Sequence, residues 1–335
     1  MHSTFILLIL YTTVTSHHSN AVEKFKLSSG YDIPAVGLGT FRLTEVEESI
    51  TNALEIGYRH IDTAFYYRNE GAIGSALQNW FQKGGKREEL FITSKLPFHA
   101  NRPESVEKYL KKSLTDLKLE YVDMYLIHAP WGIKEGNNFD KKEGSGPEVF
   151  EVVDHVALWR KMEEQVTAGR VKSIGLSNFN QTQILNVYEK ATIKPSNLQV
   201  ESHAYFRQTE LREFCKKYNI VMTAYAPLGS PSSTHKLQKG TSLLESSEIK
   251  EIAVKYNKTT AQILLRHVVQ TGLVAIPKSS NKNRQKENFD IFSFSLSEVD
   301  VEVINRLDKG ERGRIYNHLG LDKELYKHPQ YPISV

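Results

Sequence analysis

Short apolar runs alternate with segments of helical periodicity along most of the chain. Short apolar runs bounded by helical segments are typical of strands in a helix-covered sheet. This pattern predicts eight strands, at residues 36–38, 59–61, 91–95, 122–128, 171–176, 197–201, 221–225 and 273–276.

The segments between these strands carry helix signals. Thr44 followed three residues later by Glu47 is a capping-box pattern, which predicts a helix from there to about Ile56. Pro103 stands at a first-turn position before residues 104–117, whose apolar side chains recur at helical spacing. The same periodicity predicts helices at residues 157–166, 181–191, 210–218 and 261–269.

Alternation of strands and helices predicts a parallel sheet covered by helices. Eight such units predict a closed (β/α)8 TIM barrel, with the active site at the carboxyl ends of the strands. An open doubly wound sheet is the alternative. Residues 24–27 and 31–33 flank Ser-Ser-Gly30 and predict an N-terminal β-hairpin that could plug the bottom of the barrel, and residues 310–335 form a tail that we expect to act as a C-terminal substrate loop.

The N-terminus differs from the rest of the chain. Residues 5–11 read FILLILY and are followed by small polar residues. A membrane-spanning helix needs about 20 apolar residues, so this run is too short to span a bilayer. It resembles the core of a secretory signal. We therefore expect a signal peptide at residues 1–20, cleaved near 16–20, and a secreted single domain at 21–335. The leader has no Lys or Arg, which leaves a cytoplasmic protein with a retained apolar extension as the alternative.

Composition excludes several classes of protein. Of 335 residues, 40% are hydrophobic and 24% charged, which argues against disorder. The net charge of +4 is too small and too evenly spread to indicate nucleic acid binding. One cysteine excludes an intrachain disulfide and a thiolate metal cage. No Gly-x-Gly-x-x-Gly fingerprint or metal-spaced His/Cys cluster is present. We expect a monomer that binds a small molecule, with no metal and no membrane span.

Ionisable side chains stand near the ends of three consecutive predicted strands. They are Asp62, Tyr67, Lys95 and His128. Any one of them has a structural explanation, but a carboxylate, a phenol, an ammonium and an imidazole together at one barrel mouth form a set suited to carbonyl reduction. The ammonium would lower the pKa of the phenol, the carboxylate would hold the ammonium, and the imidazole would orient the carbonyl oxygen. Tyr66 competes with Tyr67 for the role of acid, and we expect only one of the two to face the site.

The chain resembles the aldo-keto reductases from about Lys24 onward. The resemblance is carried by GYRHIDTAFYYRNE (57–70), FITSKLP (91–97), YVDMYLIHAP (121–130), IGLSNFN (174–180), LQVESHAYF (198–206), AYAPLGS (224–230) and IPKSSNKNRQKEN (276–288). It implies a (β/α)8 barrel that binds NADPH without a Rossmann domain. It also implies that Asp62, Tyr67, Lys95 and His128 form the catalytic tetrad, which favours Tyr67 over Tyr66.

The resemblance further implies a set of cofactor-binding residues. They are Thr40, Asp62, Ser177, Asn178, Gln199, Tyr225, Leu228, Gly229, Ser230, Lys278, Ser279, Arg284, Glu287 and Asn288. Lys278 and Arg284 beside the Ser279 hydroxyl suit a dianionic 2′-phosphate, so NADPH is preferred over NADH. The alternative is that residues 278–286 are simply a solvated basic helix start.

Substrate contacts are expected from Tyr67 and His128 and from Phe41, Pro97 and Ala129, where many family members carry larger aromatic residues. The smaller side chains should open the pocket to a bulky or flat carbonyl substrate. A leader on a complete reductase resembles the secreted insect 3-dehydroecdysone 3β-reductases, which implies a steroid ketone. Alternatives are a broad-specificity or isoprenoid aldehyde reductase, an NADPH-binding regulatory barrel with little catalysis, and an aldolase-like barrel in which Lys95 forms a Schiff base.

Overall fold

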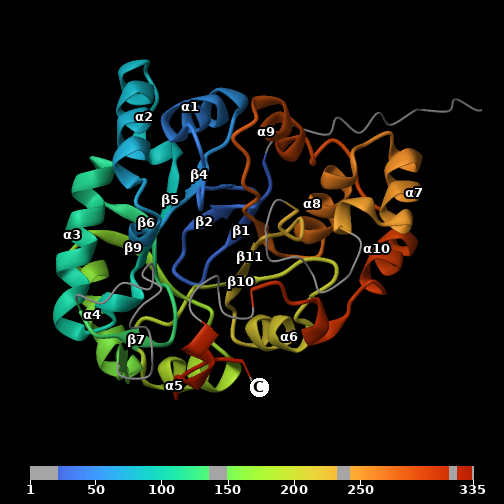
Figure 1. The fold of residues 1–335 in the computed structure, drawn as a ribbon. Coiled ribbons are helices and arrows are strands. Elements are labelled where there is room, and N and C mark those ends of the chain that lie inside the picture. Colours follow the sequence, from blue (N-terminus) through green and yellow to red (C-terminus); the bar gives the residue numbers. More distant parts are fainter. Residues whose placement is uncertain (1–21, 136–148, 232–241, 317–322, 334–335) are drawn as a thin grey trace, which may run out of the picture.

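The computed structural model describes residues 22–135, 149–231, 242–316 and 323–333. Its centre is an eight-stranded sheet in which each hydrogen-bonded pair of neighbouring strands is parallel (Figure 1). The strands are, in sheet order, β3 (Leu38–Gly39), β4 (His60–Asp62), β5 (Phe91–Leu96), β6 (Val122–Ile127), β9 (Val171–Ser177), β10 (Asn197–Glu201), β11 (Val221–Tyr225) and β12 (Val274–Ala275).

Hydrogen bonds between the first and last strand regions close the sheet. Val36 forms a parallel bridge with Ala275, and the Gly37 N–H donates to the Ala275 carbonyl over 2.9 Å. The Gly39 N–H donates to the Pro277 carbonyl over 3.0 Å. The eight predicted strands and the TIM barrel are therefore confirmed, and the open doubly wound alternative is excluded.

Helices surround the strands on the outside (Figure 1). Their apolar faces pack against the barrel, as in α3, where the predicted stripe of Val106, Leu110, Leu114 and Leu117 is buried. The α-helices are α1 (Val46–Ile56), α2 (Glu70–Gln82), α3 (Val106–Leu117), α4 (His155–Thr167), α5 (Gln181–Lys190), α6 (Thr209–Lys217), α7 (Ser247–Tyr256), α8 (Thr260–Gln270), α9 (Lys282–Phe289) and α10 (Glu298–Asn305).

The predicted capping box at α1 is wrong. Glu45 occupies the N-cap in the left-handed region with φ 42°, and no side chain caps the helix. The Thr44 hydroxyl instead pairs with the Ser280 hydroxyl at 2.9 Å, so a long-range contact replaces the local one. The periodicity also missed α2, α7, α9 and α10. In α9 the basic segment 278–286 does begin a helix, but that helix has little apolar face to detect.

The predicted N-terminal hairpin is present and closes one end of the barrel. It pairs β1 (Lys24–Lys26) with β2 (Asp32–Pro34) in antiparallel register. Leu27 and Ile33 are buried in one apolar cluster with barrel residues that include Phe91 and Val274, near the amino ends of their strands. The hairpin thus covers the end of the barrel at the amino ends of the strands, and a binding site is expected at the carboxyl ends.

The C-terminal tail packs on a second small hairpin, β7 (Gly132–Ile133) with β8 (Phe150–Glu151). The His328 ring nitrogen Nε2 lies 3.2 Å from the Gly132 carbonyl oxygen and 3.1 Å from that of Glu151. Leu325 is fully buried in an apolar cluster with Phe98 and Trp131. The tail thus lies beside the carboxyl end of the barrel.

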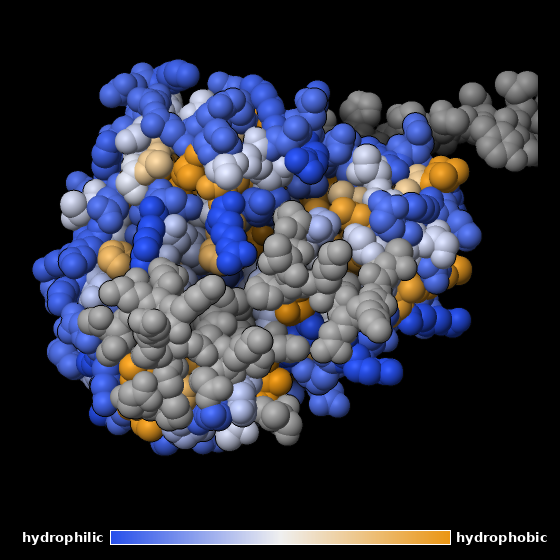
Figure 2. Space-filling model, viewed as in Figure 1, coloured by the Kyte–Doolittle hydropathy of each residue, from blue (hydrophilic) through white to orange (hydrophobic). Residues whose placement is uncertain are grey.

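Residues 1–20, predicted as a signal peptide, lie outside the described residues. Within the described ranges, no helix combines the length and apolar character needed to cross a membrane. The face drawn in Figure 2 is mainly hydrophilic where it is described, with apolar residues in small separate areas. The most exposed large hydrophobic residues described are Val254 in α7 and Val299 in α10, at 82% and 72% exposure.

Candidate active site

A cavity of about 740 Å³ lies at the carboxyl ends of the barrel strands. Asp62, Ser177 and Tyr225 reach it from the last positions of β4, β9 and β11. Parallel strands direct their carboxyl ends to the same rim of a barrel, so residues far apart in sequence meet there.

Lys95 and Asp62 form a buried ion pair beneath this cavity. The Lys95 Nζ lies 2.7 Å from Asp62 Oδ1 and donates to the Thr63 carbonyl over 2.9 Å. It also lies 3.3 Å from the Tyr67 hydroxyl. Lys95 is completely buried and Asp62 is 1% exposed, so the ammonium has no water to replace these oxygen partners. The pair therefore fixes the ammonium against the phenol.

Tyr67 and His128 both line the cavity, and their rings are neighbours. Tyr67 ends the short helical turn η1 (Phe65–Tyr67), and His128 directly follows β6. Their ring centroids are 5.6 Å apart, with the rings edge to face. The Asn178 side-chain amide donates to the His128 carbonyl over 3.0 Å and helps to hold that segment. The sequence prediction that all four tetrad residues meet at one place agrees with this geometry.

Tyr66 departs from the expectation that only one of the two tyrosines faces the site, because both line the cavity. It is the Tyr67 hydroxyl that contacts Lys95, whereas the Tyr66 ring packs against Phe98 with centroids 4.6 Å apart. The two rings therefore lie in different parts of the cavity, and the Tyr67 hydroxyl is the one beside the Lys95 ammonium.

The expected lowering of the Tyr67 pKa is wrong for the free protein. Burial, with the Asp62 carboxylate next in size, raises the pKa of Tyr67 well above its ordinary value. The Lys95 charge is offset by Asp62 at 2.7 Å, which explains why the ammonium does not overcome burial. Burial also lowers the pKa of Lys95. For His128, burial and then Lys95 hold the pKa well below its ordinary value. At neutral pH the phenol is protonated and the imidazole is neutral.

Most of the predicted cofactor residues line this one cavity. Gly229 is the exception, although its neighbours Leu228 and Ser230 both line it. The predicted residues that do so are Thr40, Asp62, Ser177, Asn178, Gln199, Tyr225, Leu228, Ser230, Lys278, Ser279, Arg284, Glu287 and Asn288.

Polar atoms in this cavity fit a nicotinamide cofactor. The buried Thr40 hydroxyl and the His128 Nδ1 have no hydrogen-bond partner among the described residues. The Gln199 amide donates to Asp62 Oδ2 over 2.6 Å, and the Tyr225 hydroxyl donates to Asn178 Oδ1 over 3.0 Å. These contacts fix the positions of amide and hydroxyl groups beside Tyr67. The carboxamide of a nicotinamide needs hydrogen-bond donors and acceptors of this kind.

The substrate end of the cavity is more aromatic than the sequence indicated. Phe41 and Ala129 line it as predicted, but Pro97 does not, and the next residue, Phe98, takes that place. Tyr66 and Trp131 complete the lining and were missed. The sequence could have indicated both, since Tyr66 directly precedes Tyr67 and Trp131 follows His128 by three residues. Ala129 does not leave an open wall, because bulky rings stand close by.

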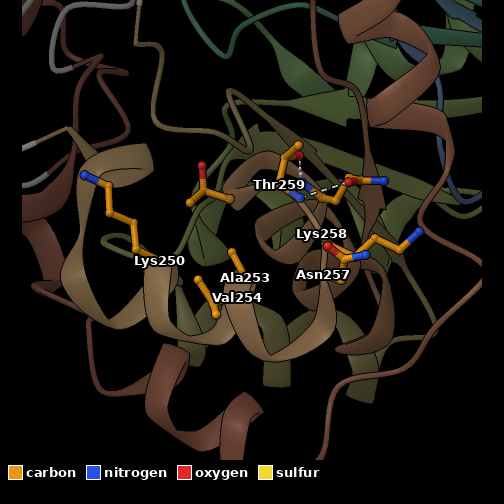
Figure 3. A pocket seen from close by; sticks show the side chains of 8 residues that line it. Lys250, Ala253, Val254, Asn257, Lys258 and Thr259 are labelled. Atoms are coloured by element: carbon orange, nitrogen blue, oxygen red, sulfur yellow. Dashed lines mark hydrogen bonds between the residues drawn. The ribbon is translucent and has the colours of Figure 1, made fainter.

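A second, shallower hollow lies on α7 and α8 (Figure 3). Its lysines come from opposite sides of the view, and each already has a carboxylate partner: Lys250 pairs with Glu245 at 2.6 Å and Lys258 with Asp290 at 2.8 Å. It has no buried polar side chain awaiting a ligand among the described residues. The candidate active site is therefore the cavity at the carboxyl ends of the barrel strands, not this hollow.

Comparison with known proteins agrees with this site. The sequence model of the Aldo/keto reductase family matches residues 35–309. The chain is 41% identical to aldo-keto reductase family 1 member A1 of Xenopus tropicalis, covering 94% of this chain and 99% of the relative. It is 40% identical to prostaglandin F synthase 1 of Bos taurus, over 93% and 98%.

Among solved structures, the chain is similar to the aldose reductase of Schistosoma japonicum. The TM-score is 0.85 at 41% identity, with 93% of this chain and 99% of that chain covered. A barrel with this site, matched by the family model over most of its length, belongs to the aldo/keto reductase family, whose members are oxidoreductases that act on carbonyl groups with NAD(P)H.

Proposed function

We propose that this protein reduces an aldehyde or ketone to an alcohol with NADPH, with Tyr67 as the general acid. The observation that supports this most directly is the position of the Tyr67 hydroxyl, which lines the cavity while lying 3.3 Å from the buried Lys95 ammonium. A phenol in that position can reach a substrate on one side and an ion pair on the other.

When bound, NADPH would supply the hydride. Residues of this chain stabilise and protonate the carbonyl oxygen of the substrate. The neutral His128 imidazole donates an N–H to the carbonyl oxygen and so opposes the charge that develops there. The Tyr67 phenol gives its proton to the same oxygen. The raised pKa of Tyr67 does not prevent this, because an alkoxide is a stronger base than a phenolate. Lys95 then faces the phenolate that remains.

The proposed preference for NADPH depends on Lys278 and Arg284. Both side chains are exposed and line the cavity beside the buried Ser279. Two cations next to a hydroxyl match the charge of a 2′-phosphate, with each charge-assisted hydrogen bond worth about 1.5–3 kcal/mol. Arg284→Ala should raise the KM for NADPH by about tenfold or more and leave the KM for NADH nearly unchanged. An unaltered preference ratio would defeat the assignment and leave residues 278–286 as a solvated helix start.

The alternative functions, an aldolase-like barrel and a regulatory barrel, can be distinguished from a reductase by experiment. An aldolase-like Schiff base requires an accessible amine, whereas the Lys95 side chain is completely buried and its ammonium contacts three oxygens. Borohydride treatment with carbonyl substrate should therefore trap no adduct. A regulatory barrel would bind NADPH but consume none across a broad carbonyl panel. We expect NADPH oxidation with formation of the matching alcohol, at least with aromatic aldehydes.

For the physiological substrate we propose a bulky, flat apolar carbonyl such as a steroid ketone, 3-dehydroecdysone being one example. The support is the aromatic lining from Phe41, Tyr66, Phe98 and Trp131, which suits an apolar ring system. Broad or isoprenoid aldehyde reduction is the alternative. A panel of ketosteroids, farnesal-like aldehydes and small aldehydes, compared by kcat/KM with NADPH, distinguishes them.

A further inference from the structure

One short piece of the C-terminal tail is attached firmly to the barrel wall. Glu201, the last residue of β10, is 1% exposed and accepts hydrogen bonds from the N–H groups of Ile315, over 2.7 Å, and Tyr316, over 2.9 Å. Just before these residues, a Cβ on Gly313 would lie 1.8 Å from the Tyr205 carbonyl oxygen. Only glycine allows so close an approach, so the backbone leading to Tyr316 has a defined position.

The side chain of Tyr316 points from this anchor to the proposed cofactor groove, whose lining it joins. Its hydroxyl lies 2.8 Å from the Ser230 hydroxyl, in the loop that follows β11. Its ring stands edge to face against Tyr225, the residue proposed to stack on the nicotinamide, with centroids 5.9 Å apart. One tail residue thus touches two parts of the proposed cofactor site.

The loop that Tyr316 contacts has a backbone that needs support. Ala226 and Ser230 both lie in the left-handed region, with φ of 51° and 45°. Residues other than glycine disfavour that region, so the backbone preferences of Ala226 and Ser230 work against this loop conformation. Within the described part of the loop, residues 226–231, the Gly229 N–H donates to the Ala226 carbonyl over 2.9 Å, and this backbone hydrogen bond opposes the tendency. The Ser230–Tyr316 contact adds a second restraint, at Ser230 itself.

We propose that Tyr316 is a cofactor-positioning residue, which carries the fixed position of the Glu201-anchored tail to the Ser230 loop and the Tyr225 ring. This inference rests on the proposed NADPH-dependent function. It assigns the tail a part in holding the cofactor, separate from the contribution of Leu325 and its neighbours to the substrate side.

The test is the NADPH dissociation constant, measured by quenching of protein fluorescence in the full chain. Tyr316→Phe keeps the ring and removes the hydroxyl, and Ser230→Ala removes the partner hydroxyl. Each should raise the Kd for NADPH by about 2- to 10-fold, the range expected for one hydrogen bond. The double variant should be no weaker than the more affected single variant, because the two hydroxyls act as one unit. The KM for NADPH should rise similarly, and by a larger factor than any fall in kcat at saturating NADPH.

Tyr188→Phe is the matched control. It removes a hydroxyl from a ring packed edge to face on another tyrosine, Tyr218, at 4.9 Å, outside the lining of the cavity. It should leave the Kd unchanged. An unchanged Kd in Tyr316→Phe, or additive losses in the double variant, would overturn the inference while leaving the proposed function intact. Failure of the wild-type chain to bind NADPH would overturn the proposed function and this inference with it.

Discussion

At the scale of single residues, burial is the largest cause of the pKa shifts of Tyr67, Lys95 and His128, ahead of neighbouring charges. The sequence placed Asp62, Tyr67, Lys95 and His128 at strand ends, and the structure brings them together. The direction of the Tyr67 pKa was not predictable from residue types, because it depends on how completely the fold removes water from the phenol and how closely Asp62 offsets Lys95.

His128 gives a pH prediction. Because burial and then Lys95 hold its pKa well below the ordinary value, kcat should show no ionisation of this residue at the pH where an ordinary histidine titrates. His128→Ala should lower kcat by about 10²–10³, as loss of a donor to a developing oxyanion does, and His128→Gln should lose less because its amide still donates. A kcat limb near pH 6.5 that vanishes in His128→Gln would contradict a neutral donor.

Glu70 links pH to stability. It is 3% exposed, accepts the Ser94 hydroxyl over 2.6 Å, and burial raises its pKa to about 7. The folded state therefore holds this proton more tightly than the unfolded state, so the stabilisation from this group is fully present below about pH 4.5 and is lost as pH rises through about 7. The free energy of unfolding should drop by up to about 3 kcal/mol from this group.

Urea unfolding at pH 5 and pH 8 measures this effect. Glu70→Gln removes the titration and should lose less stability between the two pH values than the wild type does. Glu104→Gln, at an exposed glutamate, is the control and should follow the wild type. Parallel pH profiles for wild type and Glu70→Gln would rule out the assigned titration.

At the scale of elements, strand prediction succeeded because short segments with buried apolar residues recur between the helical segments. β10 and β11 begin and end at the predicted residues. Helix prediction was less complete, since α9 and α10 have weak apolar faces and α1 begins without its predicted cap. Local patterns do not contain the Thr44–Ser280 contact, which joins residues 236 positions apart.

The N-terminal hairpin should stabilise the barrel without taking part in the site. Ile33 is 1% exposed in the cluster that fills the closed end. Ile33→Ala should lower the free energy of unfolding by about 2–4 kcal/mol, with Ile33→Val costing about 1 kcal/mol, because the fixed barrel cannot collapse onto the cavity left behind. The Kd for NADPH should be unchanged in both variants, and a weakened Kd would show that the hairpin acts on the site.

At the scale of the whole molecule, barrel closure and the position of the cavity followed from counting β/α units, whereas the aromatic substrate wall did not. Leu325 joins Phe98 and Trp131 only because the tail folds back onto the β7–β8 hairpin. No local pattern in the tail predicts that contact.

If the leader directs secretion as expected, the native protein should begin near residues 17–21, and mass spectrometry of its N-terminus checks this. The sequence contains two Asn-X-Thr triplets that could then be glycosylated, at Asn180 and Asn257. Asn257 should be the one modified, since it is exposed at the end of α7. The Asn180 side chain accepts the Gln183 N–H and donates to the Pro332 carbonyl, so a glycan there would break the α5 cap. A glycan on Asn180 but not Asn257 would contradict this account.

The most direct test of the central claim is the single-turnover rate of carbonyl reduction by NADPH-loaded Tyr67→Phe. The variant keeps the ring between Phe41 and His128 and removes only the hydroxyl beside Lys95. The rate constant should fall by about 10²–10⁴, as expected for loss of a general acid, with the Kd for NADPH within twofold of the wild type. A variant that reduces the carbonyl at close to the wild-type rate would show that the proton comes from elsewhere.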